Sequence, residues 1–94
     1  MKFREKQIEL LEIYFKAVAN RKRIKILSLV QEEPGITVFK ITEMLGIQYQ
    51  TGASHLQKLW RAGLVDKKYR DTDVIHTITY KGEMFFDFAK HLLR

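Results

Sequence analysis

A run of short polar side chains opens one helical stretch of the chain, and such side chains suit hydrogen bonding to base edges. The stretch from Gly46 to Val65 is GIQYQTGASHLQKLWRAGLV, with Leu56 and Leu59 in its second half. A helix of this kind fits the major groove of DNA, because its polar end reaches the bases while its apolar end anchors it on its own core. The expected base contacts are Gln48, Tyr49, Gln50, Thr51 and Ser54.

The chemistry of these side chains favours base contact over an ordinary exposed helix start. Glutamine forms two hydrogen bonds with adenine, and serine or threonine hydroxyls serve either kind of base edge. The alternative is a solvated first turn in which Gln48 acts only as a helix cap. We favour base contact because lysine and glutamate, the usual surface residues, are absent from this run.

Basic side chains occur at three places that can flank such a helix. They follow it along the same stretch, precede it at the start of an earlier helix, and lie in a strand behind it. Contacts between basic side chains and phosphates position a protein on the DNA backbone without recognising sequence. The alternatives are a structural hydrogen bond for His55 and a solvated strand edge for the later lysines. The expected phosphate contacts are Arg21, Lys22, His55, Lys58, Lys67, Lys68 and Arg70, and Arg61 lies on the same outward side as Lys58.

The composition supports a polyanionic partner. The 94 residues carry a formal net charge of +6 and a sequence pI of about 9.7, which favours nucleic acid first and an anionic membrane second. With 46% hydrophobic and 30% charged residues, residues 1–94 are expected to form a single globular domain. The absence of cysteine excludes disulfides and thiolate metal sites.

Several classes of protein find no support in the sequence. No apolar run approaches the roughly 18 residues of a membrane span. The start, MKFREKQIEL, lacks the continuous apolar segment of a signal peptide, so we expect a cytoplasmic protein with no membrane contact. No glycine-rich phosphate loop, HExxH sequence or nucleophile elbow is present, and we therefore expect neither an enzyme nor a cofactor.

Hydrophobic periodicity predicts five helices and one β-hairpin, a mainly α fold of the α+β type. Asn20 and Thr37 are expected to cap two of the helices, and Gly46 to close one in the left-handed conformation. The helices are expected at 4–19, 21–33, 38–45, 49–62 and 81–94, and the strands on either side of a turn at 70–73, the second over 74–80. This α-α-α-α-β-β-α order predicts a winged helix-turn-helix, with the helix-turn-helix at 37–63 and the wing at 64–80.

The first and last helices are apolar over more of their surface than one small domain needs. A terminal helix of this kind is expected to pair with another copy of the chain. Helices 1–19 and 81–94 are therefore predicted to form a homodimer interface, with Leu11, Tyr14, Phe15, Val18, Phe85, Phe88 and Leu92 in it. Elsewhere, we expect Trp60 in the core, Gly52 at a close helix contact, and a buried helix face made by Ile24, Ile26, Leu27, Leu29 and Val30.

Three sets of residues carry a family resemblance: Arg23-Ile24 with Ile26-Leu27, 41–47 (ITEMLGI), and His55-Leu56 with Leu59 and 62–65. In that order they resemble the RxxIL pattern, the first helix-turn-helix helix and the HLxxLxxAGLV signature of the ArsR family of small dimeric winged helix regulators. The resemblance implies a DNA-binding transcriptional regulator. The strand end 77–82, TITYKG, is similar to the LTxxG of MarR-type and PadR-type proteins.

The chain departs from that family at three places. Thr37 and Phe39 stand where the family carries metal-binding cysteines, and Gly52 replaces a β-branched apolar residue. The wing tip 71–73 is acidic, whereas wings are usually basic or glycine-rich. Asp87 and His91 share a helix face at i, i+4, but a surface pair is far commoner than a metal site with so few ligands, so we expect no metal.

The sequence therefore favours a sequence-specific regulator of transcription that binds double-stranded DNA. The simplest form is a homodimeric repressor on a pseudo-palindromic operator. Three alternatives stay open: a protein–protein interaction module, a ligand or metal sensor without cysteine ligands, and an RNA-binding winged helix. The sequence names neither the operator nor any small-molecule effector.

Overall fold

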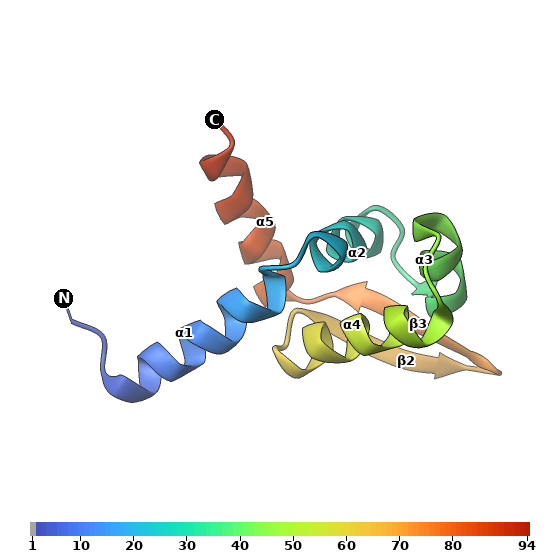
Figure 1. The fold of residues 1–94 in the computed structure, drawn as a ribbon, viewed down its shortest axis with the longest axis horizontal. Helices are drawn as coiled ribbons and strands as arrows, with labels where there is room; N and C mark the ends of the chain where they lie inside the picture. The colour runs from blue at the N-terminus through green and yellow to red at the C-terminus, as the bar shows by residue number, and fades with distance from the viewer. Residues whose placement is uncertain (1) are drawn as a thin grey trace.

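The computed structural model describes residues 2–94 and confirms a mainly helical fold with a β-hairpin (Figure 1). The elements are α1 (Glu5–Val18), α2 (Arg21–Glu32), β1 (Ile36–Thr37), α3 (Val38–Leu45), α4 (Tyr49–Arg61), β2 (Val65–Arg70), β3 (Asp73–Ile78) and α5 (Tyr80–Leu92). Helices α2, α3 and α4 form the body, and the two long strands extend from it as the wing.

The strand β1 is an addition to the expected order. It pairs antiparallel with β3, with Ile36 opposite His76, and makes a sheet of order β1-β3-β2. A strand of two residues is too short to show the alternation by which strands are recognised in a sequence. Its effect is to place β3 in the centre of the sheet, next to the start of α3.

Local hydrogen bonds explain where the helices begin and end. The Asn20 side chain accepts from the Arg23 backbone N–H at 3.1 Å, and Thr37 accepts from Lys40 at the same distance, as expected. Gly46 closes α3 in the left-handed conformation with φ of 65°. The last helix begins one residue earlier than expected because Thr79 caps it, and the same hydroxyl donates to the Gly63 carbonyl at 2.6 Å.

The core lies between α2, α3, α4 and the sheet, and two apolar residues expected there are exposed. The fully buried side chains are those of Ile26, Leu27, Val30, Ile36, Ile41, Leu59 and Val65. Ile24 is 46% exposed, because the buried stripe of α2 continues toward its N-terminus through Arg23 instead. Trp60 is 40% exposed, because it follows the buried Leu59 directly and is rotated toward the wing.

Gly52 marks the contact between the two helices of the helix-turn-helix. It is buried, and a Cβ atom built on it would collide with the Cγ2 methyl of Thr42 on α3. The expectation that this glycine serves helix packing is therefore confirmed. The close approach fixes α4 against α3 and leaves the opposite face of α4 exposed.

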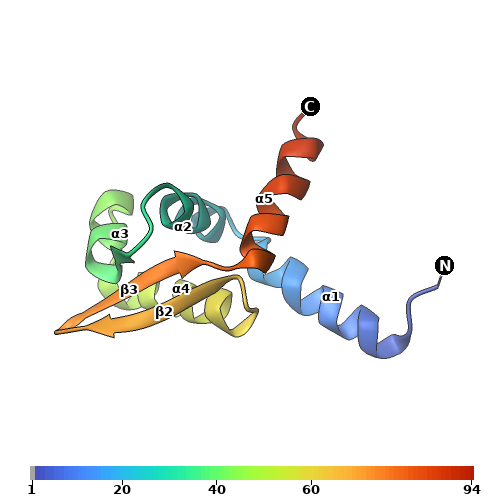
Figure 2. The ribbon, with the colours of Figure 1, turned by 180° about the vertical axis from the view of Figure 1, so that it is seen from behind.

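The first and last helices project away from the body. Figures 1 and 2 show α1 and α5 leaving the same end of the sheet and diverging, with both termini far from the wing tip. No helix within residues 2–94 combines the length and apolar character needed to cross a bilayer.

Candidate nucleic-acid interface

The exposed face of α4 carries the side chains expected to contact bases. Gln50 and Ser54 are exposed and lie opposite the buried face made by Gly52, Leu56 and Leu59. Tyr49 and Thr51 are also exposed. Gln48 occupies the N-cap position, but its side chain makes no capping hydrogen bond, so it is available to another partner. The same outward face includes Gln57 and Arg61. These two residues are not among the predicted base contacts, all of which lie at the start of the helix.

A group of basic side chains borders this face on the side of α2. Lys16, Arg23, Lys58 and Arg61 line a shallow hollow of about 510 Å³ between α1, α2 and α4. Lys16 is paired with Glu12 at 3.3 Å. The ion pairs found in residues 2–94 involve none of the other three side chains. The hollow thus presents uncompensated positive charge beside the outward face of α4.

His55 lies beside this basic group. Burial lowers the pKa of its imidazole, and the neighbouring charges of Arg23, Lys58 and Lys22 lower that pKa further. The buried His55 Nδ1 and Arg23 Nε atoms have no hydrogen-bond partner within residues 2–94. The cations clustered beside His55 suit a phosphate group, which supplies both negative charge and acceptor oxygens.

Three of the predicted phosphate contacts, Lys22, His55 and Lys58, are therefore brought together. Arg21 is exposed at the first position of α2, next to Lys22 in the chain. Arg23 follows Arg21 and Lys22 in the basic first turn of α2 but is not among the predicted phosphate contacts. Lys16 was missed because it belongs to a helix assigned only to dimer formation.

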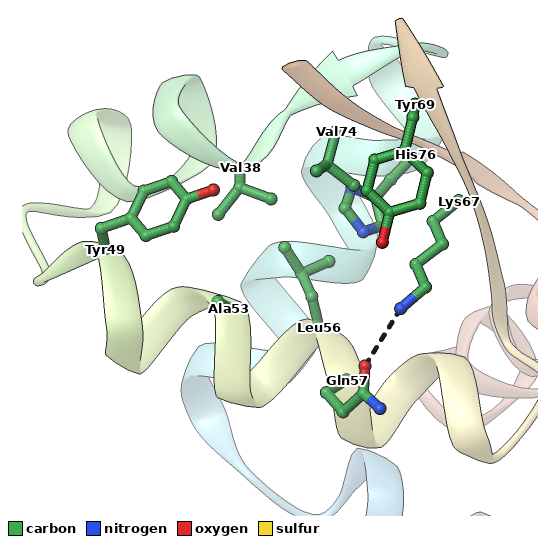
Figure 3. Close-up of a pocket in the computed structure, with 9 residues that line it drawn as sticks. All are labelled: Val38, Tyr49, Ala53, Leu56, Gln57, Lys67, Tyr69, Val74 and His76. Atoms are coloured by element: carbon green, nitrogen blue, oxygen red, sulfur yellow. Dashed lines mark hydrogen bonds between the residues drawn. The ribbon is translucent and has the colours of Figure 1, made fainter. Parts of the chain in front are cut away.

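The basic residues of the wing do not share one face. Lys67 turns back toward α4, where its Nζ donates to Gln57 Oε1 at 3.2 Å (Figure 3). The same Nζ lies 4.2 Å from the centre of the Trp60 ring. Lys68 and Arg70 line a hollow on the opposite side of the sheet. The cause is the alternation of side chains along β2, which sends neighbouring residues to opposite faces.

The residues predicted for the dimer interface gather along one groove between α1 and α5. Leu11, Tyr14, Phe15, Val18, Phe85 and Phe88 line it, together with Leu64, Lys81 and Met84, around a volume of about 340 Å³. Phe15 and Phe88 are 54% and 50% exposed, with ring centres 6.4 Å apart. Leu92 lies outside the groove lining and is 67% exposed near the end of α5.

The pair considered for metal binding is arranged differently from a chelate. His91 Nδ1 lies 2.8 Å from the backbone carbonyl oxygen of Asp87, one helical turn earlier. Within residues 2–94, no group of three or more histidine or acidic side chains is placed to hold a metal ion.

Comparison with known proteins agrees with this geometry. No curated protein sequence matches the chain. Among solved structures, HlyU from Vibrio cholerae shares 23% identity over 95% of this chain and 97% of its own, with a TM-score of 0.81. The transcriptional regulator HlyU from Vibrio vulnificus shares 22% identity over 94% and 92%, with a TM-score of 0.74.

A third structure is a homodimeric winged helix-turn-helix DNA-binding domain from Mycobacterium bovis, described as a possible ArsR-family transcriptional regulator. It shares 24% identity over 92% of this chain and 80% of its own, with a TM-score of 0.83. These likenesses confirm the winged helix fold that the resemblance to the ArsR family implies. The sequence family that matches residues 20–66 is described as winged helix-turn-helix DNA-binding. The match runs from the cap of α2 into the first strand of the wing, and the chain belongs to the winged helix-turn-helix DNA-binding family.

Proposed function

We propose that the protein is a sequence-specific regulator of transcription that binds double-stranded DNA as a homodimer. The observation that carries the proposal is the exposed polar face of α4 beside the basic group of Arg23, Lys58 and Arg61, which forms no ion pair within residues 2–94. In this arrangement α4 enters the major groove and the basic group holds the adjoining phosphates. Gln48, Tyr49, Gln50, Thr51 and Ser54 then face the bases.

The proposed dimer joins the α1–α5 groove of one copy to that of another, through helices 1–19 and 81–94. Half-exposed phenylalanines on a groove of this size favour burial against a partner. The M. bovis domain of the same fold is homodimeric, which supports the same state here. Two α4 helices related by a two-fold axis would contact half-sites about 10 bp apart, or a multiple of that spacing.

Repression is the simplest outcome of such binding, because a dimer seated on a promoter excludes polymerase. A regulator of this kind shares a compartment with the chromosome, and we accordingly place it in the cytoplasm. The helix-turn-helix at 37–63 recognises the bases. The wing at 64–80 contacts the DNA backbone through Lys68 and Arg70, while Lys67 stays hydrogen-bonded to Gln57 of α4 until DNA binds.

Replacing Gln50 by alanine is expected to weaken binding to the cognate site by about 1–3 kcal/mol and to relax specificity at one base pair. The side chain is exposed on the outward face of α4, so its loss removes base contacts without disturbing the core. Affinities for the cognate duplex and for a set of single-base variants measure the effect.

The matched control is Lys68→Ala, which removes a predicted phosphate contact instead of a base contact. It should weaken binding equally on all sequences and reduce the slope of affinity against salt concentration by about one. An equal loss on every sequence for Gln50→Ala would show that Gln50 positions the helix and does not recognise a base. An unchanged salt slope for Lys68→Ala would remove that residue from the interface.

DNA affinity is expected to rise as pH falls below neutrality, by at most about tenfold per pH unit. In the free protein, burial and three cations lower the pKa of His55, so the imidazole is neutral at pH 7. A phosphate beside it raises that pKa, so the complex binds more protons than the free protein, and acidification favours the complex. Affinities between pH 6 and 8 at fixed salt measure the linkage.

His55→Gln should flatten this pH dependence, and His91→Gln, far along α5, should leave it intact. Equal profiles for the wild type and His55→Gln would show that no phosphate lies near His55. The lowered pKa of His55 has the opposite effect on the stability of the free protein. Because the unfolded chain takes up this proton at a higher pH than the folded protein does, the free protein loses stability as pH falls below the ordinary pKa of histidine.

The test of the whole proposal is selection of bound sites from random-sequence duplex DNA at near-physiological salt, with the oligomeric state measured on the same sample. Enrichment of an inverted repeat bound by a dimer is the expected result. Binding that enriches no sequence and disappears with modest salt would contradict sequence-specific regulation.

A further inference from the structure

A small pocket lies between α4 and the wing, apart from the proposed dimer groove. Val38, Ala53, Leu56 and Val74 form its apolar part, Tyr49 and Tyr69 flank it, and Gln57, Lys67 and His76 complete the lining. Figure 3 shows these side chains converging from the start of α3, one side of α4 and the two strands of the wing. The pocket is open to solvent on one side and has a volume of about 140 Å³.

We infer that this pocket binds a small aromatic carboxylate, with the carboxylate on Lys67 and the ring between the two tyrosines. An engineered protein cavity of about 150 Å³ accommodates benzene, so the pocket holds one ring and little more. Its apolar residues, with the exposed Tyr49 and Tyr69 at either end, suit a ring in offset or edge-on packing. The geometry thus selects a single-ring ligand.

The charge of the ligand follows from the lining. Lys67 is the cation among the nine lining residues, and no aspartate or glutamate accompanies it. Its Nζ donates to the neutral Gln57 amide oxygen at 3.2 Å and lies over the Trp60 ring, so it has no carboxylate partner in residues 2–94. A ligand carboxylate offers this ammonium a shorter, charge-assisted hydrogen bond.

His76 is the second observation that points to a ligand. It is 2% exposed, and its buried Nδ1 has no hydrogen-bond partner within residues 2–94. An unpaired polar atom in this position is costly unless a ligand or water satisfies it. Burial, with a smaller effect of Lys67, lowers the pKa of His76, so the ring is neutral at pH 7 and adds no second charge.

Occupancy of the pocket has a consequence for DNA, and this part rests on the proposed function. A carboxylate neutralises Lys67 and displaces Gln57, while the ring contacts Tyr49, a proposed base contact at the start of α4. The ligand and DNA then compete for the same side chains, so each lowers the affinity of the other by the same factor.

Benzoate is the probe for the test, titrated into the full chain at constant ionic strength and followed by NMR of the Ala53, Leu56 and Val74 methyl groups. The expected result is a saturable shift of these methyls. Ala53→Leu fills the pocket and should weaken benzoate binding by about tenfold or more. The matched control, Ala19→Leu at the exposed end of α1, should bind benzoate like the wild type.

Two further comparisons separate the charge from the ring. Benzamide, which has the same shape without the negative charge, should bind at least about tenfold more weakly. Lys67→Met should show the same loss for benzoate, and it provides the answer if Ala53→Leu fails to fold. Absence of saturable shifts, or equal affinity for benzoate and benzamide, would overturn the inference.

The effect on DNA is a separate readout. Benzoate should lower the DNA affinity of the wild type and leave that of Ala53→Leu unchanged. Benzoate binding without any effect on DNA affinity would overturn the competition and support the site alone. A protein that binds benzoate but no DNA would disprove the proposed function and still support the pocket.

Discussion

Replacing Phe88 by glutamate is expected to convert the protein to a monomer and to lower its affinity for an inverted-repeat operator by about a hundredfold or more. Phe88 is half exposed on the α1–α5 groove and packs against Phe15. In the proposed dimer both rings are buried, and a carboxylate there lacks a partner and opposes its two-fold copy. The loss of DNA affinity arises because binding of one subunit to its half-site no longer places a second subunit at the other half-site.

Sedimentation or light scattering measures the oligomeric state of this variant, and titration of the operator measures its affinity. The matched control is Phe39→Glu, the same change at an exposed phenylalanine of α3 outside the groove, which should stay dimeric. A dimeric Phe88→Glu protein with wild-type operator affinity would place the dimer contact elsewhere. Circular dichroism of both variants checks that they are folded.

Gly52→Ala is expected to destabilise the protein by about 2 kcal/mol. Alanine is the better helix former by about 1 kcal/mol, so a surface glycine would give the opposite sign. Here the added methyl collides with the Thr42 Cγ2 methyl in a buried contact, and overpacking of this kind costs about 1–3 kcal/mol beyond that gain. Denaturant unfolding measures the change.

The chain offers a direct test of this cause. Thr42→Ser removes the obstructing methyl and keeps the hydroxyl that donates to the Phe39 carbonyl at 2.9 Å. The double variant should therefore recover most of the loss, with a coupling free energy of about 1–2 kcal/mol between the two sites. Strictly additive effects would show that the cost of Gly52→Ala has another origin.

Elements with local signals were predictable from the sequence. Thr37 and Gly46 fix both ends of α3 through a cap and a left-handed residue, and its bounds agree with the expectation. The start of α5 was placed one residue late, because the cap at Thr79 depends partly on the distant Gly63 carbonyl. The strand β1 exists only through its pairing with β3, and a two-residue segment carries no periodic pattern of its own.

The candidate site divides in the same way. The polar face of α4 is a property of one helix and follows from its spacing. The basic group that includes Arg23 and Arg61 forms only when α2 and α4 pack together, so the sequence lists its members without joining them. The sequence predicts Lys67 as a phosphate contact like Lys68 and Arg70, whereas the pleat of β2 and the exposed Trp60 ring draw it toward α4.

That contact between Lys67 and Trp60 has a practical consequence. Trp60 is the single tryptophan of the sequence, and it lies near the end of α4, where that helix faces the wing. Indole emission depends on nearby charge and on solvent, so any event that moves the ammonium from its place 4.2 Å above the ring changes the fluorescence. The protein thus carries an intrinsic optical reporter beside the proposed DNA interface, and stopped-flow mixing can time the arrival of a partner without any attached dye.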